Sequence, residues 1–402
     1  MAGMVIWSVL LAAIALGWVL RHRAISRGLR SAMALSEGNF VGPVAEAPRV
    51  SVLIAAKDEE ANIEPAVRTM LDQDYPNFEL IVIDDRSTDR TGQILDALRA
   101  ERNDDRLKVV HVRELRDGWF GKNNAMREGV AIAEGEWLCF GDADCRQTSR
   151  RTLSTAVRYA VAENIDFLSL LPQLEMHGIW EKIIQPVCGA VMVYWFQPAT
   201  VNDPDSPEAY ANGAFMLMKR SCYEAVGGHE VVRTEVNEDM AMARLAKRKG
   251  QRLFVIQNDG LYTVRMYTTF RQIWRGWSRI FYGCFGSFRR LRLTAIMLAV
   301  MNIIPYASLL LAGGAVLVNG WTAAGAGWQA VGVCSLLAAV AQQSVIVRFY
   351  RLSKVGGWLG PTFVLGAVIC VGILISAMFK LGGRSTTNWR GTIYRASTVV
   401  KS

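Results

Sequence analysis

Two carboxylates close together end an apolar segment near the middle of the chain. In WLCFGDADC (137–145), the run from Trp137 to Phe140 has the character of a short buried strand, and Asp142 and Asp144 follow it. Residues two apart in an extended chain lie on the same side, so these carboxylates would repel each other. The segment is either a solvated turn or a site for a cation between the two acids. Because hard divalent cations prefer carboxylate oxygens, we favour a metal site.

Acids also end other predicted strands. Strands are expected at 49–56, 78–85 and 107–112 and within 136–145, and helices at 64–74, 87–102 (capped by Ser87 or Thr88) and 121–135. This alternation predicts an α/β fold with a doubly wound, mostly parallel sheet. In such sheets ligands bind at the carboxyl ends of the strands. The three groups of polar residues expected at that edge are Lys57-Asp58-Glu59, Asp84-Asp85 and Asp142/Asp144.

Composition divides the chain into a polar part and an apolar part. The sequence has 402 residues, of which 51% are hydrophobic. Such a balance fits a soluble domain with membrane segments. Uncharged runs cover 3–20, 295–318, 328–347 and 358–379, and each has roughly the length of a membrane-crossing helix. We therefore predict an anchor over 1–22, a soluble domain over 48–265, membrane helices within 293–381 and a basic tail over 382–402.

Charge predicts how the chain is oriented. The first run lacks the basic start and the small-residue cleavage site of a signal peptide, so we interpret it as an uncleaved anchor. Four arginines follow it, which predicts that this side and the soluble domain lie in the cytoplasm: Arg21, Arg23, Arg27 and Arg30. The protein would then be a multi-pass protein of the inner membrane. Four crossings would put the basic tail outside, against the same rule, unless one C-terminal run is re-entrant.

Net charge and cysteine content exclude several other classes. The formal charge is +9, and the basic residues concentrate beside the apolar runs, which favours contact with anionic lipid rather than nucleic acid. The seven cysteines show no paired spacing. Neither a zinc site nor a disulfide framework is indicated.

Four segments in order resemble the inverting family 2 glycosyltransferases of the GT-A fold. They are AAKDEEANI (55–63), VIDDRSTDRT (82–91), GDADC (141–145) and VNEDMAMARLAKRKG (236–250), and the resemblance covers about 48–290. Further segments, such as ANGAFMLMKRSCYEAVGGH and FRQIWRGWSR, are similar to the branch that glycosylates apolar lipids. That branch includes hopanoid-associated and carotenoid glycosyltransferases and, more distantly, ceramide glucosyltransferases. Processive synthases carry Gln-x-x-Arg-Trp, whereas here Gly276 separates Arg275 from Trp277.

The resemblance implies a nucleotide-sugar site and a divalent cofactor. Asp144 would bind Mg²⁺ or Mn²⁺, and Asp142 would face the ribose or the metal. Asp85 would bind the uracil ring, and Lys122 would reach the phosphates unless it is a surface lysine. The remaining residues expected in the nucleotide-sugar site are Ala56, Glu59 and Asp84, of which Asp84 has a competing role in helix capping.

The resemblance also implies a base for the acceptor. An inverting transfer needs a group that removes the acceptor's proton, and we choose Asp239, whose pKa the neighbouring Glu238 would raise. The alternative is that both acids only stabilise the start of a helix. His229, Arg275 and Trp277 are expected near the acceptor or the diphosphate, although a histidine beside two glycines is more often a turn residue.

Two segments have the apolar spacing of helices that lie at a membrane surface. In 270–288 the apolar side chains form one stripe, and Arg271, Arg275 and Arg279 lie off it; 178–196 has a similar stripe. We interpret 268–290 as an amphipathic interfacial helix that admits a lipid acceptor. The sequence thus predicts a membrane-bound, metal-dependent transferase that moves sugar from a UDP-sugar to an apolar lipid. The alternatives are transfer to polyprenyl phosphate, a processive synthase and a non-catalytic scaffold.

Overall fold

The structure, a computed structural model, describes residues 2–31, 34–39, 47–322, 324–382, 387–389, 392–395 and 398–401. The chain forms two compact units. Unit one comprises Met1–Ala32, Met176–Met192 and Tyr267–Leu381, and unit two comprises Met33–Glu175, Val193–Met266 and Gly382–Ser402.

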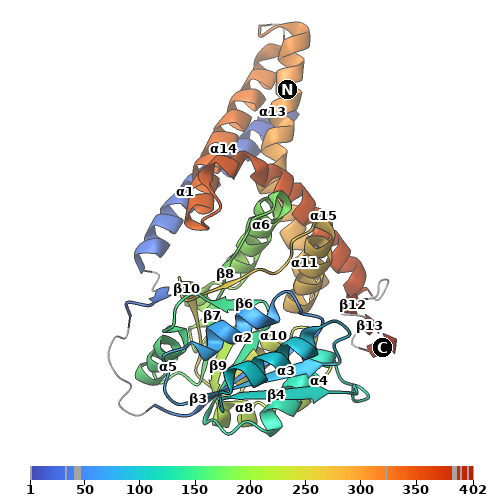
Figure 1. The fold of residues 1–402 in the computed structure, drawn as a ribbon. Coiled ribbons are helices and arrows are strands. Elements are labelled where there is room, and N and C mark those ends of the chain that lie inside the picture. Colours follow the sequence, from blue (N-terminus) through green and yellow to red (C-terminus); the bar gives the residue numbers. More distant parts are fainter. Residues whose placement is uncertain are drawn as a thin grey trace. The chain divides into compact units, whose positions relative to one another are not determined.

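An eight-stranded sheet forms the centre of unit two. Its strand order is β1 (Ala34–Ser36), β10 (Leu253–Asp259), β7 (Phe167–Leu171), β9 (Phe215–Lys219), β5 (Trp137–Asp142), β2 (Val50–Ala56), β3 (Phe78–Asp85) and β4 (Leu107–Val112) (Figure 1). Only β9 runs antiparallel to its neighbours β5 and β7 within this sheet. The predicted mixed, mostly parallel sheet is therefore confirmed. Every residue of β3 is buried, as expected for a strand covered on both faces.

The helices of unit two alternate with these strands, as predicted. They are α2 (Ile63–Leu71), α3 (Thr91–Arg102), α4 (Gly121–Ala131), α5 (Thr152–Ala162), α7 (Pro198–Val201), α8 (Arg220–Ala225), α9 (Gly228–Val231) and α10 (Glu238–Arg248). α4 packs against β2 and β3. Two small sheets complete the unit, one formed by β6 (Cys145–Gln147), β11 (Tyr262–Val264) and β8 (Gln173–Leu174) and the other by β12 (Thr387–Trp389), β13 (Thr392–Arg395) and β14 (Thr398–Lys401).

The predicted cap of α3 is wrong. The helix begins at Thr91, whose backbone N–H donates to Asp89 Oδ1 at 2.9 Å. Ser87 Oγ instead accepts from the backbone N–H of Asp58, and Thr88 donates its backbone N–H to Asp58 Oδ1. Ser87 and Thr88 therefore join the loop after β3 to the loop after β2.

Unit one is helical. Its elements are α1 (Ala2–Ser31), the part of α6 (Ile179–Trp195) up to Met192, α11 (Phe270–Phe285), α12 (Phe288–Leu298), a π-helical turn (Ala299–Ile303), α13 (Ile304–Asn319), α14 (Gly325–Leu352), a 3₁₀ turn (Gly357–Thr362) and α15 (Phe363–Leu381). Four stretches are long and apolar enough to cross a membrane, in agreement with the predicted runs: Ala2–Arg23, Phe288–Asn319, Gly325–Leu352 and Gly357–Leu381.

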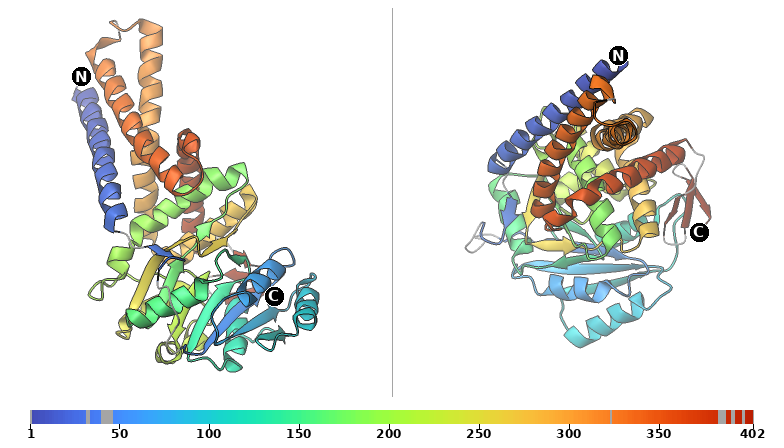
Figure 2. Two further views of the ribbon diagram at one scale, coloured as in Figure 1. Left: turned by 60° about the vertical axis from the view of Figure 1, so that its left-hand side comes forward. Right: turned by 90° about the horizontal axis from the view of Figure 1, so that it is seen from above.

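Polar contacts join the first apolar helix to the later ones. α1 runs beside α14, as both views in Figure 2 show, and Arg348 Nη1 donates to Ser26 Oγ at 2.6 Å. Trp7 Nε1 donates to Ser308 Oγ of α13 at 2.9 Å. The N-terminal helix α1 therefore packs against α13 and α14 of unit one.

The apolar stripe of α11 lies mainly in the core of unit one. Ile273, Trp277 and Phe281 are buried, and the ring of Trp274 packs on Gly372 of α15. The ring of Tyr267 packs so closely on Gly276 that no side chain fits there, because a Cβ would lie 2.1 Å from the ring. This contact explains the glycine that interrupts the Arg-Trp pair. An interfacial position for the helix stays a prediction.

Candidate active site

The strands that end in acids lie next to the same strand, β2, in the sheet. In the sheet register Ala56 lies opposite Asp84 of β3, and Ala55 lies opposite Asp142 of β5. From β2 the chain proceeds to β3 and β4 on one side and then returns to place β5 on the other. This reversal is the topological switch point at which open α/β sheets bind ligands.

Lys122 joins two of the predicted site acids. Its Nζ lies 2.6 Å from Asp142 Oδ1 and 2.7 Å from Glu238 Oε1, so it links the end of β5 to the first residue of α10. The Lys122 and Glu238 side chains are only 17% and 6% exposed. Burial alone lowers the pKa of Lys122, but the charges of Asp142 and Glu238 outweigh it and hold that pKa well above its ordinary value. Lys122 is therefore a charged member of the site and not a surface lysine.

Asp144 lies close to other acids. Burial, together with the charges of Asp142 and Glu59, raises the pKa of Asp144 to about 8. Within the described part of the chain, no basic side chain forms an ion pair with Asp144. A divalent cation would relieve this repulsion, and the oxygen donors suit Mg²⁺ or Mn²⁺.

The described residues contain no group of three or more metal-ligating His, Cys, Asp and Glu side chains. Asp144 and Asp142 would therefore supply only part of a coordination shell. The rest must come from other oxygen donors, such as a diphosphate or water.

Asp239 is held by backbone amides at the start of α10. Its Oδ2 accepts from the N–H of Gly213 at 2.9 Å, and its Oδ1 accepts from its neighbour Met240 at 2.7 Å. Burial, reinforced by the charge of Glu238, raises the pKa of Asp239 to about 7. A carboxyl group with this pKa can exchange a proton near neutral pH.

The loops after β2 and β3 form a second ordered part of the site. Asp85 pairs with Arg86 through two bonds, Nε to Oδ1 at 2.8 Å and Nη2 to Oδ2 at 3.0 Å. Lys57 Nζ donates to the carbonyl oxygen of Arg86 at 2.8 Å. Arg86 adopts a left-handed φ of 55°, a conformation that costs energy in a non-glycine residue and is common at functional sites. Gly121 approaches so closely that a Cβ there would lie 2.5 Å from Asp85 Oδ2.

Asp84 has partners on the other side of β3. Its Oδ2 lies 3.0 Å from Nδ1 of His111, and its Oδ1 accepts from the backbone N–H of Ser87. His111 also contacts Asp96, and hydrogen bonds to Asp84 and Asp96 raise the pKa of His111. Asp84 therefore supports the turn that carries Asp85. Its direct contact with a donor stays a prediction, as do those of Ala56 and Glu59.

His229 is part of the core of unit two. It is 1% exposed, and both its backbone N–H and Nδ1 contact the hydroxyl of Tyr223. Its ring meets Phe140 edge to face. Burial, with a smaller effect of Lys122, lowers the pKa of His229 to about 3, so the imidazole is neutral. Its predicted contact with the acceptor or the diphosphate is untested, as are those of Arg275 and Trp277, which belong to unit one.

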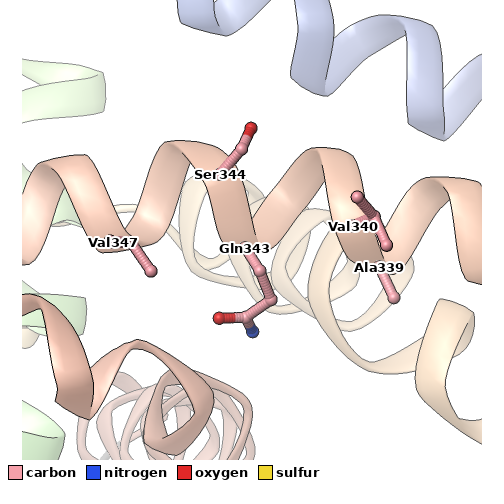
Figure 3. A pocket seen from close by; sticks show the side chains of 5 residues that line it. All are labelled: Ala339, Val340, Gln343, Ser344 and Val347. Atoms are coloured by element: carbon pink, nitrogen blue, oxygen red, sulfur yellow. The ribbon is translucent and has the colours of Figure 1, made fainter.

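An open cavity of about 450 Å³ lies along α14 in unit one. Its lining residues are Ala339, Val340, Gln343, Ser344 and Val347 (Figure 3). Gln343 Nε2 donates to Tyr306 Oη at 2.7 Å. This cavity is apolar and does not contain the predicted site residues.

Three residues that contribute to the site were not predicted. Arg86 was visible beside Asp85 in the segment VIDDRSTDRT, but nothing in the sequence shows that its guanidinium turns back onto that acid. His111 is the fifth residue of a predicted strand, and only the sheet register brings it to Asp84. Gly213 lies between Lys122 and Asp239, since a Cβ there would be 3.2 Å from Nζ and 3.4 Å from Oδ2.

The chain is similar in sequence to known glycosyltransferases. Residues 51–226 match the family described as glycosyl transferase family 2. The 4,4'-diaponeurosporenoate glycosyltransferase of Staphylococcus haemolyticus is 25% identical over 57% of this chain and 60% of its own length. A beta-monoglucosyldiacylglycerol synthase of Nostoc sp. is 29% identical over 45% of this chain and 38% of its own length. The chain thus spans less than two thirds of these relatives.

Among solved structures, a mannosyltransferase from Pyrobaculum calidifontis, in complex with GDP-Man and Mn²⁺, superimposes with a TM-score of 0.54 and 19% identity. The superposition covers 94% of this chain and 98% of the mannosyltransferase. At this identity the likeness shows the fold, which is GT-A. Residues 51–226 are thus similar to the glycosyl transferase family 2 domain, and the fold is that of the GT-A enzymes.

Proposed function

We propose that this protein is a membrane-bound inverting glycosyltransferase that moves a sugar from a UDP-sugar to a hydroxyl or carboxyl group of an apolar lipid. The observation that carries the proposal is the ion-paired Lys122, which joins Asp142 of β5 to Glu238 of α10. It brings the two carboxylate motifs of the sequence into one site, with the half-buried Asp239 next to Glu238.

The donor is held at the carboxyl edge of the sheet. Asp85 and Arg86 together present an acceptor and a donor of hydrogen bonds, which suits the N–H and flanking carbonyls of a uracil edge. Asp144 and Asp142 would hold Mg²⁺ or Mn²⁺, which would supply positive charge for the leaving diphosphate. Lys122 adds a positive charge from the protein for the phosphates.

Asp239 removes the proton of the acceptor. Its pKa of about 7 leaves a useful fraction ionised at neutral pH, as a general base requires. The backbone N–H of Gly213 fixes one oxygen of this carboxylate. Glu238 is paired with Lys122. The negative charge of Glu238 contributes to the raised pKa of Asp239.

The acceptor is a lipid. The relatives are named for acting on a carotenoid acid and for making a glucosyldiacylglycerol, and four helices of this chain are apolar enough to cross a membrane. We place the protein in the inner membrane with the GT-A domain in the cytoplasm. The reason is that arginines such as Arg21 and Arg23 follow the first apolar run, and positive residues mark the cytoplasmic side of a membrane helix.

Transfer of labelled sugar from UDP-glucose into an organic extract tests this function. Membranes from cells that make the protein are incubated with Mg²⁺ or Mn²⁺, with and without chelator, beside membranes that lack the protein. The expected result is label in the organic phase only with protein and metal. Binding of UDP without transfer to any lipid, across a panel of nucleotide sugars and lipids, would contradict catalysis and favour a scaffold.

A further inference from the structure

A cluster of positive charge lies where α11 meets the end of α15 within unit one. Lys380 Nζ donates to Ser278 Oγ at 2.6 Å, and Ser278 Oγ donates to the carbonyl oxygen of Arg275 at 3.0 Å. Arg275, Ser278 and Arg279 share one face of α11, because residues three and four apart in a helix are neighbours. Arg279 Nη2 also donates to Tyr267 Oη at 3.3 Å.

Neither of the two helices that form this cluster carries an acid. The charges that act on Lys380 are those of Arg279 and Arg275, and both are positive. Neither Lys380 nor Arg275 forms an ion pair with a carboxylate among the described residues. The sequence also contains no Asp or Glu after Asp259, so α11 and α15 have no acid of their own.

The position of Lys380 is unusual for a lysine at the end of an apolar helix. Such a lysine normally extends its ammonium into water. Here the ammonium contacts Ser278, which is 1% exposed, and lies near two guanidinium groups. Like charges in a partly buried setting repel each other, and an anion bound among them would remove that repulsion and form charge-assisted hydrogen bonds.

We propose that Lys380, Arg275, Arg279 and Ser278 form a binding site for the phosphate group of a membrane lipid. Lys380 is the residue before the last of the apolar stretch Gly357–Leu381, so it lies at headgroup level when that stretch crosses the bilayer. The guanidinium groups match phosphate geometry. This site rests on the membrane attachment proposed above, and it deepens the expected role of Arg275. A nucleotide diphosphate has the same chemistry, and the test separates the two sources.

The test measures the binding of dodecyl phosphate and, separately, of UDP with Mg²⁺ to the purified full-length protein in dodecyl maltoside by calorimetry. Lys380→Met keeps the aliphatic part of the side chain and removes the charge. It is expected to weaken dodecyl phosphate binding by at least about tenfold, the scale of one lost hydrogen bond to a charged group. Lys380→Arg is expected to bind within roughly threefold of wild type, since the charge remains.

Arg289→Met, which removes an exposed cation of α12, is the matched control and is expected to leave binding unchanged. If Lys380→Met weakens UDP binding instead, the phosphate site stands with the donor diphosphate as its occupant. Equal affinity of wild type and Lys380→Met for both ligands, with equal thermal stability, would overturn the site. Because the assay measures binding and not transfer, its failure is distinct from a failure of the proposed function.

Discussion

The backbone N–H of Gly213 donates to Oδ2 of Asp239 at 2.9 Å, and the same glycine lies against Lys122 Nζ. The lysine that joins Asp142 to Glu238 and the carboxylate proposed as base are thus separated by one residue without a side chain. The distance between the ammonium group of Lys122 and the carboxylate of Asp239 depends on this glycine.

Gly213→Ala is expected to reduce kcat by roughly 10- to 100-fold, because misplacement of catalytic groups by about 1 Å has effects of that size. A Cβ would lie 3.2 Å from Lys122 Nζ and 3.4 Å from Asp239 Oδ2. Initial rates at saturating donor and acceptor measure the effect. Gly189→Ala is the control, since its Cβ meets nothing within 4 Å. Unchanged kcat in Gly213→Ala would show that this spacing does not matter.

Lys122→Met is expected to destabilise the protein by about 3 kcal/mol, the usual cost of removing one partner of a buried ion pair. The Glu238 side chain is 6% exposed and would lose its cation. The double variant Lys122→Met/Glu238→Gln should recover much of that stability but not activity. Urea unfolding of the three proteins tests this. A double variant as unstable as the single one would mean that packing, rather than charge, accounts for the loss.

The rate is expected to depend on the ionisation of Asp239. Burial and Glu238 raise the pKa of Asp239 to about 7, and a base works only when deprotonated. Activity should therefore be full above this pKa and fall about tenfold per pH unit below it. The profile of kcat/KM between about pH 5.5 and 8.5, with protein stability followed in parallel, measures this. A profile that stays level below pH 7 would exclude Asp239 as the base.

Gly121→Ala is expected to raise the KM for the nucleotide sugar by roughly tenfold, as when one hydrogen bond to a charged group is weakened. Its Cβ would lie 2.5 Å from Asp85 Oδ2 and 2.8 Å from Arg86 Nη2, which forces this pair to move. The kcat should change much less, because Asp239 is held by Gly213 and not by Gly121. Saturation curves for the donor give both constants. A loss confined to kcat would place the Asp85–Arg86 pair outside donor binding.

The sequence predicted those features that depend on local pattern. The alternation of strands and helices around β2, β3 and β5 follows from apolar periodicity. The acids at the strand ends are visible in the sequence. Long apolar runs such as Gly357–Leu381 are visible without tertiary information. From these features both the GT-A sheet and the four apolar helices could be predicted.

Features that depend on distant contacts were not predictable. Ser87 has the type of a helix cap, but Asp58 of a neighbouring loop binds it instead. The apolar stripe of α11 is visible in the sequence, but the sequence does not show that Phe281 is 0% exposed. The contact of Asp84 with His111 depends on the register of β3 and β4. In both contacts the partner lies far away in sequence.

The most direct test of the central claim is the rate of sugar transfer to lipid by purified Asp239→Asn and wild type at equal donor occupancy. Occupancy is set by measuring UDP binding to each protein with Mg²⁺ present. The account predicts equal UDP binding and a transfer rate that falls by roughly 100-fold or more, the scale of general-base catalysis. A variant that binds UDP normally and transfers sugar at the wild-type rate would contradict the account.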